Sequence, residues 1–164
     1  MSRPNLDIED TTERQKPLFV LLLDYRKFFD FIIQDIVWGL ASWWGIPQGI
    51  VRQLERFYED LTSVFKLHGR FGKPWKRTNS LAQGCSLSMM LVNLPVTAWA
   101  KATLLKMPTA LAGISAYVDD RVIRSGSFAH LEELLARTVQ FDRMTGQYLK
   151  LTNLWGLALT QIPK

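Results

Sequence analysis

An apolar run that ends in an aspartate is the feature that most constrains how this chain folds. Leu18 to Leu23 are six consecutive apolar residues, and Asp24 follows them directly. A run of this length and composition is typical of a strand that is buried on both faces of a sheet. A carboxylate at the end of such a strand is costly to desolvate unless a positive charge compensates for it. The sequence therefore predicts a buried strand with a cation beside its terminal carboxylate.

The composition indicates a folded intracellular domain. The chain has 164 residues, of which 48% are hydrophobic and 12% aromatic, enough for one domain with a core. Its one cysteine, Cys85, allows neither an internal disulfide framework nor a cysteine-based zinc site. Residues 1–17 are polar and are expected to be a disordered or truncated leader, without a secretion signal. We expect no membrane partner and a location in the cytoplasm, the nucleus or both.

Apolar spacing and turn residues predict a mixed fold. Helices are expected at residues 31–44, 47–61, 86–105 (with a kink at Pro95) and 128–144. A hairpin is expected from Val64 to Thr78, with its turn at Gly69–Gly72. Two short strands follow, in "ISAYV" and "RVIRS", with Asp119–Asp120 as the turn, and residues 148–151 and 154–160 are expected to form a closing hairpin. This order predicts an α+β fold of layered sheet and helices.

Three carboxylates are the candidates for chemistry. Asp24 ends one predicted strand, and Asp119 and Asp120 lie at the turn of another, far along the chain. If the two strands are neighbours, the carboxylates meet and cannot all stay ionised without cations. Magnesium prefers oxygen ligands, and two such ions can stabilise both oxygens of a phosphoryl transfer. Taken singly, an Asp-Asp pair is an ordinary turn and Asp24 an ordinary strand end.

A third element stands before the long helix at residues 86–105. Gln83 and Gly84 precede it, and glycine lets the backbone approach a ligand closely. The amino end of a helix favours anions. The alternative is a helix start that only needs a glycine turn.

The positive charge is concentrated in the middle of the chain. The net charge is +5, and no acidic residue occurs between Asp60 and Asp119. The basic residues in that interval are Lys66, Arg70, Lys73, Lys76, Arg77, Lys101 and Lys106. This distribution suits a polyanion such as nucleic acid, and it equally suits a solvated basic surface.

Taken in order, four motifs resemble the palm of a reverse transcriptase, most similar to the polymerases of non-long-terminal-repeat (LINE-type) retrotransposons. They are "LDYRKFFD", "AQGCSLS", "AYVDD" and "GQYLKLTN". The resemblance extends from about Leu18 to Leu159. It implies one palm domain over residues 18–160, an antiparallel sheet packed against helices, without the fingers and thumb domains of a longer polyprotein.

The resemblance also implies a reaction: RNA-directed DNA polymerisation from a deoxynucleoside triphosphate onto a primer 3′-hydroxyl. It implies two Mg²⁺ ions (or Mn²⁺) held by Asp24, Asp119 and Asp120. An RNA template and a DNA primer are the implied partners. The residues expected to contact nucleotide are Tyr25, Phe29, Gln83 and Gly84, and those expected to contact nucleic acid are Lys73, Lys76, Arg77 and Arg121. Phe29 would exclude ribonucleotides by bulk, although either Phe28 or Phe29 could be a core aromatic.

Departures from the family pattern leave two alternatives open. Ser86 stands where the family has proline, and Trp155 where its fourth motif has a lysine. With fingers and thumb missing, these motivate a catalytically inactive palm remnant that at most binds nucleic acid. An RNA-directed RNA polymerase palm is the other alternative, and Val118 and Phe29 both point away from it.

Overall fold

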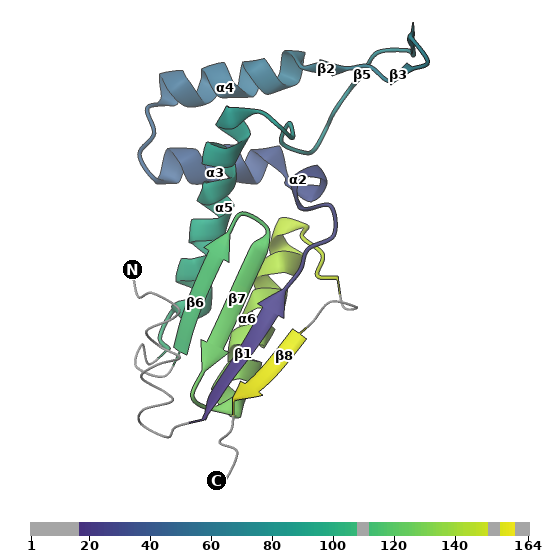
Figure 1. The fold of residues 1–164 in the computed structure, drawn as a ribbon. Coiled ribbons are helices and arrows are strands. Elements are labelled where there is room, and N and C mark those ends of the chain that lie inside the picture. Colours follow the sequence, from purple (N-terminus) through teal and green to yellow (C-terminus); the bar gives the residue numbers. More distant parts are fainter. Residues whose placement is uncertain (1–16, 108–111, 151–154, 160–164) are drawn as a thin grey trace. The chain divides into compact units, whose positions relative to one another are not determined.

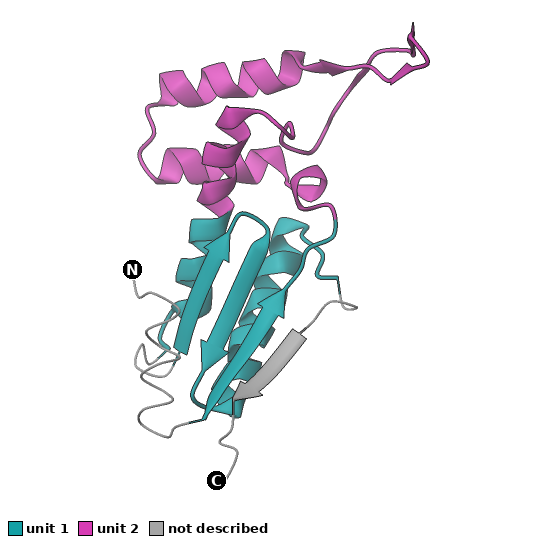
Figure 2. Ribbon diagram, viewed as in Figure 1, with its two compact units in different colours: residues 1–26, 96–164 teal, residues 27–95 magenta. Residues whose placement is uncertain are grey.

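The structure, a computed structural model, describes residues 17–107, 112–150 and 155–159. The chain divides into two compact units (Figure 2). Unit 1 comprises residues 1–26 and 96–164, and unit 2 comprises residues 27–95. Within the described ranges, none of the helices combines the length and the hydropathy that a bilayer crossing requires.

A sheet of four antiparallel strands forms the centre of unit 1. The strands are β1 (Leu18–Leu23), β6 (Ala112–Tyr117), β7 (Asp120–Ser125) and β8 (Trp155–Leu159), and their order across the sheet is β6-β7-β1-β8 (Figure 1). The bounds of β1 are those predicted from the apolar run. Strand β1 lies between β7 and β8, so both of its edges are hydrogen-bonded.

Helix α6 (Phe128–Thr145) covers one face of this sheet (Figure 1). Leu23 and Ile123 are buried on the covered face, and Phe19 makes an edge-on ring contact with Phe128 of α6. Leu22 points to the opposite face and is 42% exposed. The expectation that β1 is buried on both faces is therefore wrong at Leu22, because successive side chains of a strand alternate between the faces.

Unit 2 is built from helices. They are α2 (Phe28–Phe31), α3 (Gln34–Trp43), α4 (Gln48–Asp60) and the first half of α5 (Ser86–Leu104). Tyr58 of α4 packs against the Trp38 ring and shares a buried hydrogen bond of 2.8 Å with the Ser88 hydroxyl of α5. The boundary between the units falls at Pro95 within α5, where proline removes one helical hydrogen bond.

The predicted hairpin in unit 2 is present, but its turn lies elsewhere. Strand β2 (Thr62–Ser63) pairs with β5 (Trp75–Lys76), and β3 (Lys66–Leu67) pairs with β4 (Arg70–Phe71). The two turn residues are His68 and Gly69, both with positive φ. Two consecutive positive φ angles make a type I′ turn, whose twist matches that of paired strands. The prediction of a turn at Gly69–Gly72 is wrong for this reason.

The predicted closing hairpin is wrong as well. Strand β8 pairs with β1 instead, and Leu149 forms an isolated bridge with Tyr25. Both segments therefore extend the β1 ladder, which offers a long apolar partner. Residues 151–154 lie outside the described residues.

The β6–β7 turn consists of Val118 and Asp119, one residue earlier than the predicted Asp119–Asp120 turn. Val118 has φ 59°, whereas Asp119 has no positive φ. This pattern corresponds to a type II′ turn, whose first central position normally needs glycine. A β-branched residue with positive φ is strained by about 1–3 kcal/mol.

We expect Val118→Gly to raise the free energy of unfolding by about 1 kcal/mol, because the strain relieved exceeds the entropic cost of glycine, about 0.5–1 kcal/mol. Urea unfolding followed by circular dichroism measures the change. The control is Val122→Gly in β7, where the backbone is extended and glycine should destabilise. If Val118→Gly destabilises as much as the control, the turn is not strained.

Candidate active site

The sheet register brings the predicted carboxylates to one end of unit 1. Leu23 and Arg121 form the last pair of the β1–β7 ladder, and Asp24 and Asp120 each adjoin this pair. Asp119 occupies the turn directly beside Asp120. The end of β1 and the β6–β7 turn thus lie at the same end of the sheet (Figure 1).

Side chains alternate between the two faces of the sheet, which places Asp24 and Asp120 on the face opposite to α6. We call this face the open face. Leu23 and Arg121 are buried on the face that α6 covers, and each immediately neighbours one of the two aspartates. Asp24 is half-buried and Asp120 is exposed. The carboxylates are therefore accessible to a ligand in solution.

A lysine contacts the first of these carboxylates. Lys150 Nζ lies 3.5 Å from Asp24 Oδ2, and the Lys150 amide donates a 2.9 Å hydrogen bond to the Asp24 carbonyl. Among the described residues, no three His, Cys, Asp or Glu side chains are gathered closely enough to hold a metal ion. The Lys150 ammonium therefore supplies a positive charge next to Asp24 in this structure.

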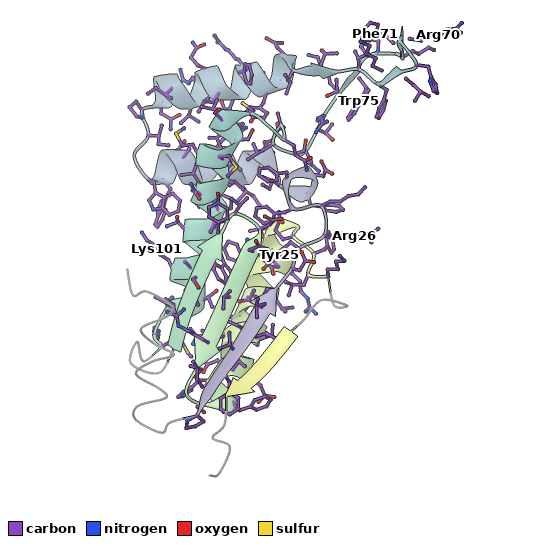
Figure 3. The ribbon with its side chains drawn as sticks, viewed as in Figure 1. Tyr25, Arg26, Arg70, Phe71, Trp75 and Lys101 are labelled. Atoms are coloured by element: carbon purple, nitrogen blue, oxygen red, sulfur yellow. The ribbon has the colours of Figure 1, made fainter. Side chains whose placement is uncertain are left out.

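A buried polar network lies beneath the carboxylates. Arg121 Nη1 donates to the Tyr25 hydroxyl at 2.8 Å and to Asp142 Oδ1 at 3.2 Å, and Tyr25 donates to Asp142 Oδ2 at 2.8 Å. The Arg121 guanidinium also stacks on the rings of Tyr25 and of Trp99, a residue of α5. The network joins the chain just after β1, where Figure 3 labels Tyr25, to the start of β7 and to helix α6.

Burial sets the protonation of this network. It raises the pKa of the Tyr25 phenol far above its usual range, so the hydroxyl stays protonated and donates to Asp142. Burial also raises the pKa of the Asp142 carboxyl, while the Arg121 guanidinium and the Tyr25 hydroxyl act in the opposite direction.

Two expected ligand contacts disagree with this geometry. The Arg121 side chain is 1% exposed and the Tyr25 side chain is buried, so neither is available to nucleic acid or nucleotide. Strand alternation turns both side chains away from the open face and into the core, which leaves only the backbone of Tyr25 as the expected nucleotide contact. They follow Asp24 and Asp120 directly in the chain, and their hydrogen bonds join these two segments at the end of the sheet.

The other expected nucleotide contacts belong to unit 2. The Leu81 amide donates to the Phe29 carbonyl at 3.0 Å, and the Ser80 amide to the Ile32 carbonyl at 2.9 Å. These bonds hold α2 beside the segment that precedes Gln83 and Gly84. Phe28 is the buried aromatic of the pair, and Phe29 is half-buried. Gln83 and Gly84 are exposed, and Gly84 has φ 81°, a conformation that favours glycine.

The expected basic contacts of unit 2 differ in accessibility. Lys73 and Lys76 are exposed, and Lys76 lies 3.9 Å from the Asp60 carboxylate. Arg77 is half-buried, donates to the Ser63 and Ser80 hydroxyls and lies 4.0 Å from Asp30. Lys73 and Lys76 are thus open to solvent, whereas Arg77 also holds the hairpin to its surroundings.

Sequence reasoning missed Lys150 and Asp142 as parts of the site. Lys150 belongs to the "GQYLKLTN" motif, and an apolar-lysine-apolar triplet on a partner segment of β1 was the available signal. Asp142 gave no signal beyond its position on the inward face of a predicted helix, where a carboxylate needs a buried cation.

Removing one partner of the buried network should be costly. We expect Asp142→Ala to lower the free energy of unfolding by about 3–5 kcal/mol, because it leaves the Arg121 charge uncompensated in the core. The double variant Arg121→Met/Asp142→Leu should recover most of this loss, since apolar replacement removes both charges. Denaturant unfolding measures both changes.

The matched control is the partly exposed pair of Arg137 and Glu133, where Glu133→Gln should cost no more than about 1 kcal/mol. An Asp142→Ala variant that is no less stable than this control would show that the buried pair does not hold the sheet end.

Comparisons with known proteins find likeness in fold. No family model matches the sequence, and no curated protein matches it. Two solved structures that resemble it are apo telomerase from Candida tropicalis truncated from the C-terminal domain (TM-score 0.76, 15% identity) and telomerase from Candida albicans in complex with the TWJ fragment of telomeric RNA (TM-score 0.75, 14% identity). They cover 100% and 99% of this chain, which spans 37% and 31% of theirs. The chain therefore has an α+β fold like that of these telomerase structures.

Proposed function

We propose that this chain is the palm portion of a metal-dependent RNA-directed DNA polymerase. The observation that carries the proposal is the pairing of β1 with β7, which ends at Leu23 and Arg121 and so brings the adjoining Asp24 and Asp120 to the same end of the sheet as the turn that holds Asp119. The likeness in fold to telomerase structures supports the same class of protein. An origin in a retrotransposon-like element, with fingers and thumb elsewhere in a longer polyprotein, belongs to this proposal.

The residues at the sheet end fit divalent cations. Asp24, Asp119 and Asp120 offer only oxygen donors, the set that Mg²⁺ prefers. The Lys150 ammonium beside Asp24 supports this fit, because it is a positive charge at the same carboxylate. When bound, two Mg²⁺ or Mn²⁺ ions supply charge neutralisation for an in-line phosphoryl transfer.

The protein side chains would then position the reactants. Asp24 and Asp119 would hold the cations, and Asp120 would add negative charge that retains them. In unit 2, the half-buried Phe29 is the candidate that crowds the 2′ position of a deoxynucleotide, and the exposed Gln83–Gly84 turn is the candidate contact for the new base. Lys73 and Lys76 are candidate contacts for the RNA template or the DNA primer.

A second candidate function is an inactive palm that binds nucleic acid. It is favoured by the Lys150–Asp24 ion pair and by carboxylates that are not gathered into a three-residue cluster among the described residues. Binding of divalent cations separates the two candidates, because an inactive remnant has no need of a cation site at the sheet end.

Loss of either carboxylate should abolish catalysis. We expect Asp24→Asn and Asp119→Asn each to remove magnesium-dependent primer extension on an RNA template, because a neutral amide holds the cation far less well than a carboxylate. Extension is measured in a protein that contains this chain together with its flanking regions. Manganese binding, followed by electron paramagnetic resonance, gives a readout that does not depend on activity.

The control is Glu132→Gln, which removes one exposed negative charge from α6 and should leave extension and manganese binding unchanged. Primer extension that persists in either aspartate variant would refute the assignment of the metal-binding carboxylates.

Lys150 should compete with the cation for Asp24. We expect Lys150→Gln to tighten manganese binding by up to about fivefold, the range that corresponds to a solvent-exposed ion pair. Manganese titration measures the change, and Lys101→Gln on α5 is the control for the loss of a positive charge elsewhere in unit 1. Weaker manganese binding in the Lys150 variant would mean that the lysine supports the site rather than competing for it.

A further inference from the structure

The hairpin of unit 2, residues 62–77, exposes large apolar side chains that no described element covers. Phe65 is 73% exposed and Phe71 is 72% exposed, and Leu67 and Trp75 are exposed as well. Within unit 2 the hairpin extends away from the helices (Figure 2). Contiguous exposed apolar side chains of this kind mark an interaction surface.

Two aromatic rings on the hairpin are stacked nearly parallel to each other. Phe65 and Trp75 stack with ring centroids 5.9 Å apart and an interplanar angle of 25°. Phe71 lies next to Arg70 at the tip of the hairpin, and Trp75 lies on the returning strand (Figure 3). The type I′ turn at His68–Gly69 fixes the pairing of the strands that carry these rings.

Positively charged side chains lie over two of these rings. Lys66 Nζ lies 5.4 Å from the centre of the Phe71 ring, and the Arg77 guanidinium lies 5.2 Å from the centre of the Trp75 ring. The hairpin carries five basic residues and no acidic one: Lys66, Arg70, Lys73, Lys76 and Arg77. The surface is therefore complementary to a ligand that combines negative charge with flat, apolar rings.

We propose that this hairpin binds single-stranded nucleic acid, with unpaired bases on its aromatic faces and phosphates on its lysine and arginine side chains. Unpaired bases expose their ring faces, whereas the bases of a duplex are already stacked on one another. Aromatic platforms flanked by positive charge are how proteins bind single strands without reading a sequence. The proposal does not depend on the metal-binding carboxylates, which belong to unit 1.

The test is fluorescence anisotropy of the full chain with a labelled 12-nucleotide oligouridine, in EDTA and without nucleotide. We expect Phe65→Leu and Phe71→Leu each to weaken binding by about tenfold, because loss of one stacked base costs roughly 1–3 kcal/mol. Lys73→Gln should flatten the slope of log K against log salt by about 0.7, the value for one phosphate contact on a single strand. Trp43→Leu on α3, another exposed aromatic of unit 2, is the matched control and should bind as wild type.

Several outcomes would overturn the proposal. They are wild-type binding by both phenylalanine variants, an equal loss in the Trp43 control, and tighter binding of a duplex of the same length. A change in self-association on sedimentation, with oligouridine binding unaltered, would assign the hairpin to a protein partner instead. Because this assay contains EDTA and no nucleotide, failure of the polymerase proposal is distinguishable from failure of this one. Because Phe65 and Phe71 lie on different parts of the hairpin, one variant remains informative if the other does not fold.

Discussion

The buried contact between Arg121, Tyr25 and Asp142 is the constraint on which the rest of unit 1 depends. A guanidinium that is 1% exposed must find compensating groups, and here a carboxylate, a phenol and two aromatic rings provide them. The same contact joins the chain after β1, the start of β7 and helix α6. Because Tyr25 follows Asp24 and Arg121 follows Asp120, fixing the buried pair also fixes where the two carboxylates emerge on the open face.

This arrangement explains why both core and candidate site come from the same short segments. Strand alternation sends one residue into the core and the next toward solvent, so structure and chemistry share the ends of β1 and β7. The strained turn at Val118 adds to this pattern, since backbone strain persists where surrounding structure holds it in place. In unit 2, by contrast, the core and the exposed surface come from different segments. Helices form the core, and the hairpin exposes aromatic and basic side chains to solvent.

Much of the fold could be predicted from local patterns. The apolar run gave the bounds of β1, and helical spacing predicted α3 to α6 to within about three residues at each end. The burial of Tyr25 and Arg121 could not be predicted, because a tyrosine or an arginine next to an aspartate at a strand end suits a ligand as well as a buried polar network. The pairing of segments far apart in the chain could not be predicted from the sequence either. The bridge from Leu149 to Tyr25 and the pairing of β8 with β1 depend on which strand offers a free edge, which no local pattern states.

The central claim is that Asp24 and Asp119 share a divalent cation at one end of the sheet. A crystal of the chain soaked in manganese, with anomalous difference maps at the manganese edge, tests it most directly. The account predicts a peak about 2 Å from carboxylate oxygens of both Asp24 and Asp119, with the Lys150 ammonium displaced from Asp24. A map in which Asp24 stays paired with Lys150, and manganese is bound elsewhere or not at all, would contradict it.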